Sequence, residues 1–194
     1  MPRPLGSFLV ALVCSGATLT VAAQPLDAPV RFNANAINMN AGAAGSVEIV
    51  VSRWSTNAER DKLMSTMLKS GPEKLLGALQ DMPRVGYFQT PGRVGIDVHF
   101  ARRRPTAEGG SRVILVTDRR IGFWEAANQP RSIDYPFTVI ELQLNREGEG
   151  EGKISVATKI IADAENNIIT LENYDTQPVM LTNVRTERAS TPVQ

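Results

Sequence analysis

The sequence predicts a mostly β domain of the α+β class. We expect a curved antiparallel sheet of about eight strands, as a partly open barrel or a two-layer sandwich, with an inserted pair of short helices. Three observations lead to this. Short apolar runs of strand type recur along the chain. Residues 56–83 carry helix signals instead. The C-terminal third alternates strand-like runs with polar turns.

The N-terminus has the pattern of a secretory signal peptide. Arg3 is followed by an apolar run that ends in the small residues Val21-Ala22-Ala23. We therefore expect an exported protein, periplasmic or secreted, with an uncleaved membrane anchor as the alternative. No second apolar run has transmembrane length.

A length of 194 residues is typical of one domain. We expect residues 1–23 to form the signal peptide and 24–30 a linker. Residues 31–186 then form the single globular domain, and 187–194 a polar tail.

The charge of the mature chain argues against some partners. Cleavage removes Arg3 from the 21 basic residues, which leaves 20 against 20 acidic ones. No overall field then draws the protein to nucleic acid. The charge is uneven, with eight arginines and four acids in residues 93–131, and eight acids and three bases in residues 141–175. These two segments either face each other or are solvated.

The first half of the domain begins with two strands and two helices. Strands are expected over 31–40 and 47–54, the second with its β-branched residues on one face. Thr56 and Glu59 fit a capping box, in which each side chain accepts the other's backbone N–H. Ser70 and Glu73 fit a second one. Two short amphipathic helices are therefore expected before Pro83.

Three strands follow, over 85–90, 95–102 and 112–118. In the second, alternation predicts that Ile96, Val98 and Phe100 share one face and Asp97, His99 and Ala101 the other. The third, RVILVTD, is apolar on both faces, which is typical of a strand in the middle of a sheet.

The C-terminal third reads as a meander with strands near 137–146, 153–161, 168–174 and 179–185. A register that places Leu144 opposite Ile154 keeps the apolar residues on one face. The next turn similarly allows Ile160 to oppose Ile169.

The residue inventory disfavours most catalytic and metal sites. After cleavage the chain has one histidine, His99, and no cysteine, so a zinc site or a thiol nucleophile is not expected. No phosphate-binding glycine loop leads from a strand into a helix. We expect no cofactor and no metal, and no catalytic residues are assigned. The alternative is a hydrolase-type enzyme with an acid–base site near Asp97 and His99.

The stretch IGFWEAANQPRSIDYPF, residues 121–137, is the best candidate for function. It holds four of the chain's eleven aromatic residues and is longer than a normal hairpin loop. Phe123, Trp124, Arg131 and Tyr135 could contact a ligand or partner, since Trp, Tyr and Arg are enriched at binding hot spots. The alternative is a plug that closes an open end of the curved sheet.

Four motifs together span most of the mature chain: RWSTNAERDKL, DRRIGFWEA…DYPFTVIEL, GEGKISVATKI and LENY…PVMLTNV. With these motifs the chain resembles a family of uncharacterised exported bacterial proteins. The resemblance implies an exported bacterial protein with a single domain, and it implies no activity, cofactor or site residue.

We therefore expect an exported non-enzymatic domain. It would bind a small apolar or amphipathic ligand, or a partner protein of the cell envelope, through residues 121–137. A structural cell-envelope accessory protein is a further alternative.

Overall fold

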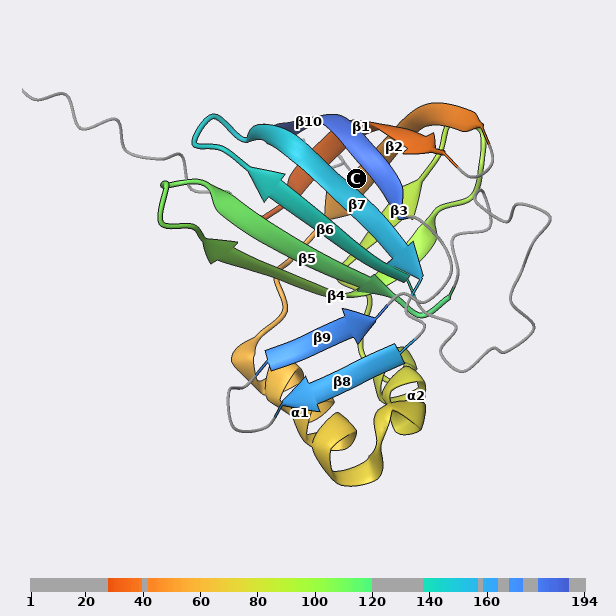
Figure 1. Ribbon diagram of the computed structural model, residues 1–194, viewed down its shortest axis with the longest axis vertical. Coiled ribbons are helices and arrows are strands. Elements are labelled where there is room, and N and C mark those ends of the chain that lie inside the picture. The colour runs from red at the N-terminus through yellow and green to blue at the C-terminus, as the bar shows by residue number, and fades with distance from the viewer. Residues whose placement is uncertain are drawn as a thin grey trace, which may run out of the picture.

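The structure, a computed structural model, describes residues 28–39, 42–119, 138–156, 159–163, 168–172 and 178–188 of the chain. Eight antiparallel strands close into a barrel in the order β1-β10-β7-β6-β5-β4-β3-β2 (Figure 1). These strands are β1 (Val30–Asn38), β2 (Ala43–Val51), β3 (Gly86–Gln89), β4 (Ile96–Pro105), β5 (Ser111–Thr117), β6 (Thr138–Leu144), β7 (Glu149–Val156) and β10 (Val179–Arg188). The expected mostly β fold is confirmed, and the sheet closes fully instead of remaining partly open or splitting into two layers.

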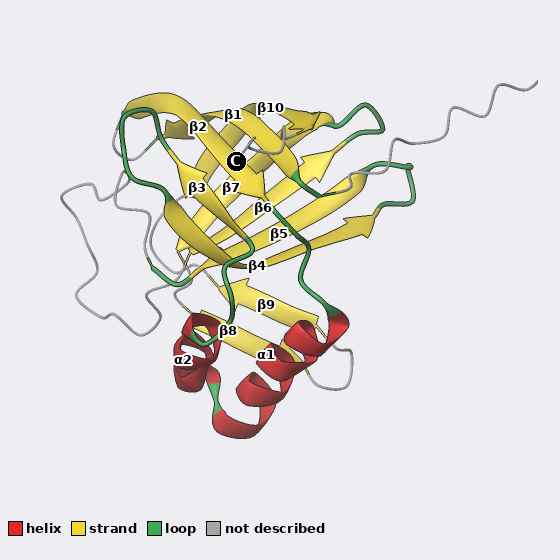
Figure 2. Ribbon diagram, turned by 180° about the vertical axis from the view of Figure 1, so that it is seen from behind, coloured by secondary structure: helices red, strands yellow, loops and turns green. Residues whose placement is uncertain are grey.

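Two insertions interrupt the up-and-down path of the barrel. Between β2 and β3 lie α1 (Asn57–Ser70), a 3-10 turn (Pro72–Lys74) and α2 (Leu75–Gln80), which is the expected helix pair. Between β7 and β10 lie β8 (Lys159–Asp163) and β9 (Ile168–Glu172), which form a separate two-stranded sheet. Figure 2 shows both insertions on the same side of the barrel. No helix within the described ranges is long and apolar enough to cross a membrane.

The barrel interior is a packed apolar core. Alternate residues of each strand point inward, as the period of two requires. Phe32 and Phe88 are 0% and 1% exposed, and Leu142 is 0% exposed. Each such side chain contributes about 1.5–3 kcal/mol through burial. The alternation predicted for Val47, Ile49 and Val51 is confirmed, since all three lie in this core.

A β-bulge in β4 corrects the predicted alternation of that strand. The register shifts between Val98, which pairs with Thr117, and Phe100, which pairs with Val116. A bulge adds one residue and so reverses which later side chains face inward. Ala101 therefore lies in the barrel core, and Phe100 turns to the outer face.

The helices cover the outer face that the bulge exposes. Phe100 packs in a second buried cluster with Met67 of α1, Leu79 of α2 and Met82 after it. Val116 of β5 packs against the same cluster. This explains why RVILVTD is apolar on both faces, because β5 faces the barrel core on one side and the helices on the other.

The start of α1 forms as predicted, whereas the second predicted cap does not. The Glu59 N–H donates to Thr56 Oγ1 at 3.1 Å, and the Thr56 N–H donates to Glu59 Oε2 at 2.7 Å. After α1 the chain turns at Gly71, with φ of 86°, and enters the 3-10 turn. Glu73 lies within this 3-10 turn and does not form the predicted cap. Helix α2 therefore begins at Leu75 without a side-chain cap.

The turn between β6 and β7 is tighter than the sequence predicts. Asn145 Oδ1 accepts the N–H groups of Glu147 and Glu149, and Gly148 adopts φ of 79°. Strand β7 therefore begins at Glu149, and Leu144 pairs with Gly150 instead of Ile154. The predicted register is wrong by four residues, but an even shift keeps the same faces inward.

The expected strand 153–161 is in fact two strands, because β7 ends at Val156 and β8 begins at Lys159. The predicted pairing of Ile160 with Ile169 is also wrong, since Ile160 pairs with Leu171.

Glycines of β7 let the barrel wall bend sharply. A Cβ on Gly150 would collide with the carbonyl oxygen of Gln143 on the neighbouring strand. On the other side, the register of β10 shifts between Leu181 and Val184, and Asn183 has φ of 52°. A glycine in one strand beside a bulge in the next strand is typical of a tight barrel corner.

Candidate functional site

The four predicted binding residues, Phe123, Trp124, Arg131 and Tyr135, lie outside the described residues. The structure does describe where their loop leaves and rejoins the barrel. The Thr138 N–H donates to Thr117 Oγ1 at 3.3 Å, and both threonine hydroxyls donate to the Arg119 carbonyl. Both threonines are buried. The loop is therefore anchored on two adjacent strands by a small buried polar network.

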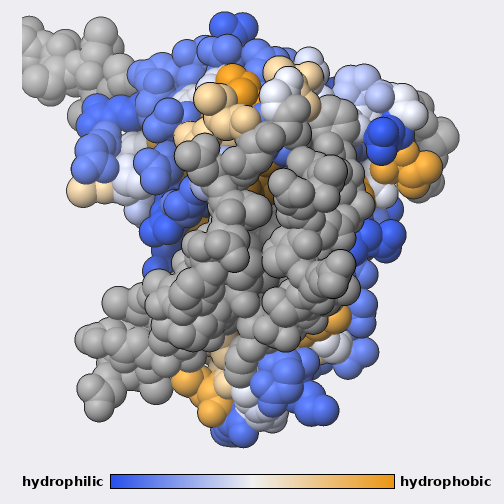
Figure 3. Space-filling view, turned by 45° about the vertical axis from the view of Figure 1, so that its right-hand side comes forward, coloured by the Kyte–Doolittle hydropathy of each residue, from blue (hydrophilic) through white to orange (hydrophobic). Residues whose placement is uncertain are grey.

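The end of the barrel that carries this loop also presents exposed apolar side chains. Because neighbouring strands are antiparallel, the β1–β2 turn, the β3–β4 turn and the β5–β6 connection all leave the barrel at one end (Figure 1). Met39 in the first turn is 67% exposed and Val94 in the second is 93% exposed. Figure 3 brings this side forward, and the coloured part of its surface shows separate hydrophobic areas among hydrophilic ones. We call Met39 and Val94 the apolar rim.

Asp97 and His99 are both on the outer face of β4, but they have different partners. His99 Nδ1 lies 2.9 Å from the Met82 carbonyl oxygen, and its Nε2 lies 3.8 Å from Asp118 Oδ1. Asp97 Oδ1 instead lies 3.4 Å from Arg84 Nε. The acid beside His99 is therefore Asp118, and not Asp97 as the sequence predicts.

No hydroxyl group of a described residue hydrogen-bonds to His99, as a nucleophile activated by this histidine would. Its Nδ1 faces a backbone carbonyl oxygen, which requires a proton on that nitrogen. The arrangement ties the end of α2 to β4 and β5. Asp118 directly follows the strand RVILVT. This position is the one signal in the sequence for its contact with His99, because strands 95–102 and 112–118 could pair and bring the two residues together.

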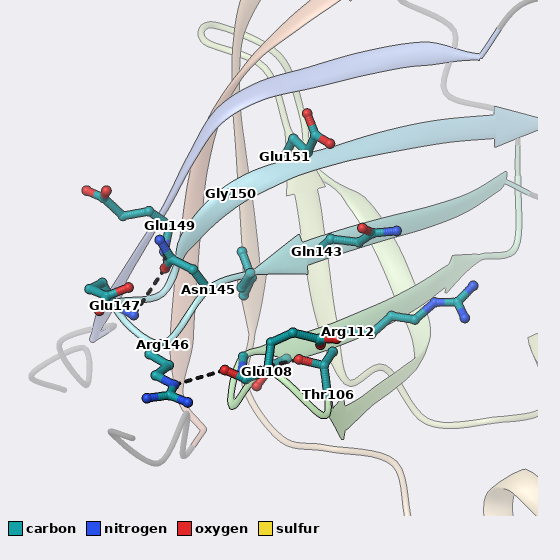
Figure 4. Close-up of a pocket in the computed structure, with 13 residues that line it drawn as sticks. Thr106, Glu108, Arg112, Gln143, Asn145, Arg146, Glu147, Glu149, Gly150 and Glu151 are labelled. Atoms are coloured by element: carbon teal, nitrogen blue, oxygen red, sulfur yellow. Dashed lines mark hydrogen bonds between the residues drawn. The ribbon is translucent and has the colours of Figure 1, made fainter. Parts of the chain in front are cut away.

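An open cleft of about 690 Å³ lies at the opposite end of the barrel (Figure 4). The β4–β5 turn forms one wall, and the β6–β7 turn forms the other. Arg146 Nε donates to the Glu108 carbonyl oxygen at 2.9 Å and links the two turns. The charged lining is mixed, with Arg112 and Arg146 beside acids that include Glu151. The sequence REGEGEG predicts only a hairpin turn here.

Beside the cleft, the arginine-rich segment 93–131 meets the acidic segment 141–175. Glu141 accepts Arg112 Nε at 2.8 Å, and Lys153 Nζ lies 3.4 Å away. Burial raises the pKa of Glu141, but the hydrogen bond and charge of Arg112, with the charge of Lys153, lower it further, so the net shift is downward. Glu141 is therefore held as a carboxylate between two strands of the barrel wall.

Comparison of the chain with protein-family models, with curated proteins and with solved structures finds no match. Among the described residues, no three His, Cys, Asp or Glu side chains gather in a group that could hold a metal ion.

Proposed function

We propose that the chain is an exported, non-enzymatic binding domain that holds a partner protein at the barrel end carrying loop 121–137. The observation that carries this is the exposure of Val94, an apolar side chain at the tip of a turn that is 93% accessible. Met39, on the neighbouring turn, is exposed at the same end. These two exposed apolar side chains lie on separate turns at the barrel end from which loop 121–137 departs, and the proposed interface includes both of them.

The packed barrel interior favours a partner protein over a small apolar ligand. A barrel that carries such a ligand needs a cavity among its inward-facing side chains. Here Phe32, Phe88 and Leu142 meet in that interior and are essentially inaccessible. A ligand would have to displace them, whereas a partner chain needs only the outer surface.

The proposal of export rests on the N-terminal pattern and on the family resemblance. The expected mature N-terminus lies near Gln24, in the periplasm or outside the cell. Mass spectrometry of the protein from its native host tests this. Recovery of intact Met1 in the membrane fraction would favour the anchor instead.

Site-specific cross-linking in the native host tests the proposed interface. A photoreactive residue replaces Val94, and in a matched control it replaces Glu147, which is exposed on a turn at the opposite end. We expect one discrete protein adduct from position 94, which Trp124→Ala weakens. No adduct, or the same adducts from both positions, would contradict the proposal.

One observation supports the enzyme alternative: Asp118 Oδ1 lies 3.8 Å from His99 Nε2. A hydrolase of this kind would use Asp118, and Asp97 would be dispensable. A hydrolase screen therefore compares the wild type with His99→Ala and Asp97→Asn. Turnover that only His99→Ala abolishes, with an unchanged melting temperature, would replace the binding proposal.

A further inference from the structure

A group of arginines gathers where the start of α1 meets side chains of β4. Arg102 of β4 reaches toward the helix, and its Nη2 donates to Asn57 Oδ1 at 2.9 Å. Arg60 of α1 and Arg104 of β4 both lie close enough to Arg102 to influence its ionisation. We call Arg60, Arg102 and Arg104 the arginine cluster. It belongs to the end of β4 that is remote from the apolar rim.

The charge of Arg102 is poorly compensated. Its Nε atom is out of reach of water and has no hydrogen-bond acceptor. Burial lowers the pKa of Arg102, the charges of Arg60 and Arg104 lower it further, and Asp61 opposes them. Asp61 is itself occupied by Arg60, whose Nη2 lies 2.6 Å from its Oδ1.

The neighbouring strand adds another positive charge. Arg104 pairs directly with Arg112 of β5 across the barrel wall. Like charges that oppose each other on adjacent strands destabilise a sheet. Arg112 is neutralised by Glu141, which it contacts at 2.8 Å, whereas Arg104 has no ion pair with any described residue. Glu141 is shared with Lys153, so it leaves no spare negative charge for Arg104. The three arginines of the cluster thus face one acid, Asp61, and the sum of three and minus one is +2.

We propose that the arginine cluster binds an oxyanion of the phosphate class that carries two negative charges. Planar guanidinium groups match phosphate oxygens in pairs, which makes arginine the usual residue for this ligand. The first turn of α1 lies beside Arg102, through Asn57, and its positive end favours an anion at the same place. The bound anion removes the mutual repulsion of the three cations. The buried Nε stays covered, so the ligand meets the outward N–H groups.

Titration of the whole folded protein with inorganic phosphate at constant ionic strength, monitored by NMR, tests the site. We expect saturable shifts confined to the first turn of α1 and to β4 and β5. Arg102→Gln and Arg104→Gln should each weaken binding by about tenfold or more, since a charge-assisted hydrogen bond is lost. Arg102→Lys keeps the charge but loses the planar fork, and should be intermediate.

The control is Arg185→Gln, since Arg185 is an exposed arginine on β10 with a distant partner at 3.8 Å. It should bind phosphate like the wild type. If Arg102→Gln does not fold, Arg104→Gln still decides, because Arg104 is exposed. Shifts that do not saturate, or that Arg185→Gln weakens equally, would overturn the proposal.

A second experiment separates free phosphate compounds from lipid headgroups. The protein is sedimented with phosphatidylcholine vesicles that do or do not contain phosphatidic acid, whose headgroup is a phosphate monoester. Sedimentation that needs both phosphatidic acid and Arg104 identifies a lipid ligand. Saturable phosphate binding without sedimentation identifies a soluble phosphate compound, and failure in both experiments refutes the site.

Discussion

The bidentate pair of Arg53 and Glu59 makes the stability of the helical insertion depend on pH. Arg53 Nη1 and Nη2 donate to the two Glu59 oxygens at 3.0 and 2.7 Å. The same carboxylate accepts the Thr56 N–H that begins α1. We expect Glu59→Gln, which keeps the shape and one acceptor oxygen, to destabilise the protein at neutral pH and not in strong acid.

The pKa of Glu59 gives the size of this effect. The hydrogen bond from Arg53 lowers it from 4.5 to about 2, against the opposing effect of burial and with help from Thr56. At 1.36 kcal/mol per pKa unit, this difference sets an upper limit of about 3.4 kcal/mol. Arg53 is 40% exposed, so solvent screens the pair, and we expect about 1–2 kcal/mol.

The sign follows from the lowered pKa. A carboxyl group whose pKa is lower in the folded state stabilises the fold above the unfolded value of 4.5. That contribution is lost as the pH falls from 4.5 through about 2, the pH at which half of the folded groups are protonated.

Urea unfolding of the wild type and of Glu59→Gln at neutral pH and near pH 2 measures the difference. Glu187→Gln, which removes an exposed acid on β10, controls for the loss of one charge. If Glu59→Gln destabilises the protein equally at both pH values, the contribution of the ion pair is refuted and only the cap remains.

Further predictions concern packing and backbone geometry. Leu142→Ala, in the barrel core, should lower the free energy of unfolding by about 2–5 kcal/mol, whereas Leu68→Ala, at a site 47% exposed, should lower it by less than about 1 kcal/mol; urea unfolding compares them. Gly150→Ala should lower the melting temperature because its Cβ would meet the Gln143 carbonyl. Gly77→Ala should raise it, since nothing lies near a Cβ there and alanine favours a helix. Equal effects at the two glycines would contradict the tight barrel corner.

Periodicity predicted the class of fold well, because it depends on which side chains must be buried. Val47, Ile49 and Val51 repeat every second residue and could only be buried on one face. Local backbone geometry was less accessible. The bulge beside His99 leaves no mark in the sequence, since Phe100 and Ala101 are both acceptable inside a barrel. The register of β7 depended on whether Gly150 belonged to a turn or to a strand.

The sites were harder to predict because they combine distant segments. His99 and Asp118 meet only when β4 and β5 pair, and Arg102 meets Arg60 only when the start of α1 lies against β4. Sequence spacing does not indicate the contact of Arg102 with Arg60, and it indicates that of His99 with Asp118 only if the two strands are assumed to pair. The residues that attracted attention by composition, such as Trp124, lie in the segment that the structure does not describe.

The pairing of β1 with β10 has a consequence for the order of folding. The Thr182 hydroxyl donates to the Asn35 carbonyl across 147 positions of sequence. A chain that is synthesised or translocated N-terminus first must therefore keep both β1 and β7 without one neighbour until the last strand emerges. Such unpaired edges template aggregation, and contacts between distant residues form slowly. Barrel closure should then be the final and slowest step, and an intermediate lacking β10 should be a natural target for chaperones.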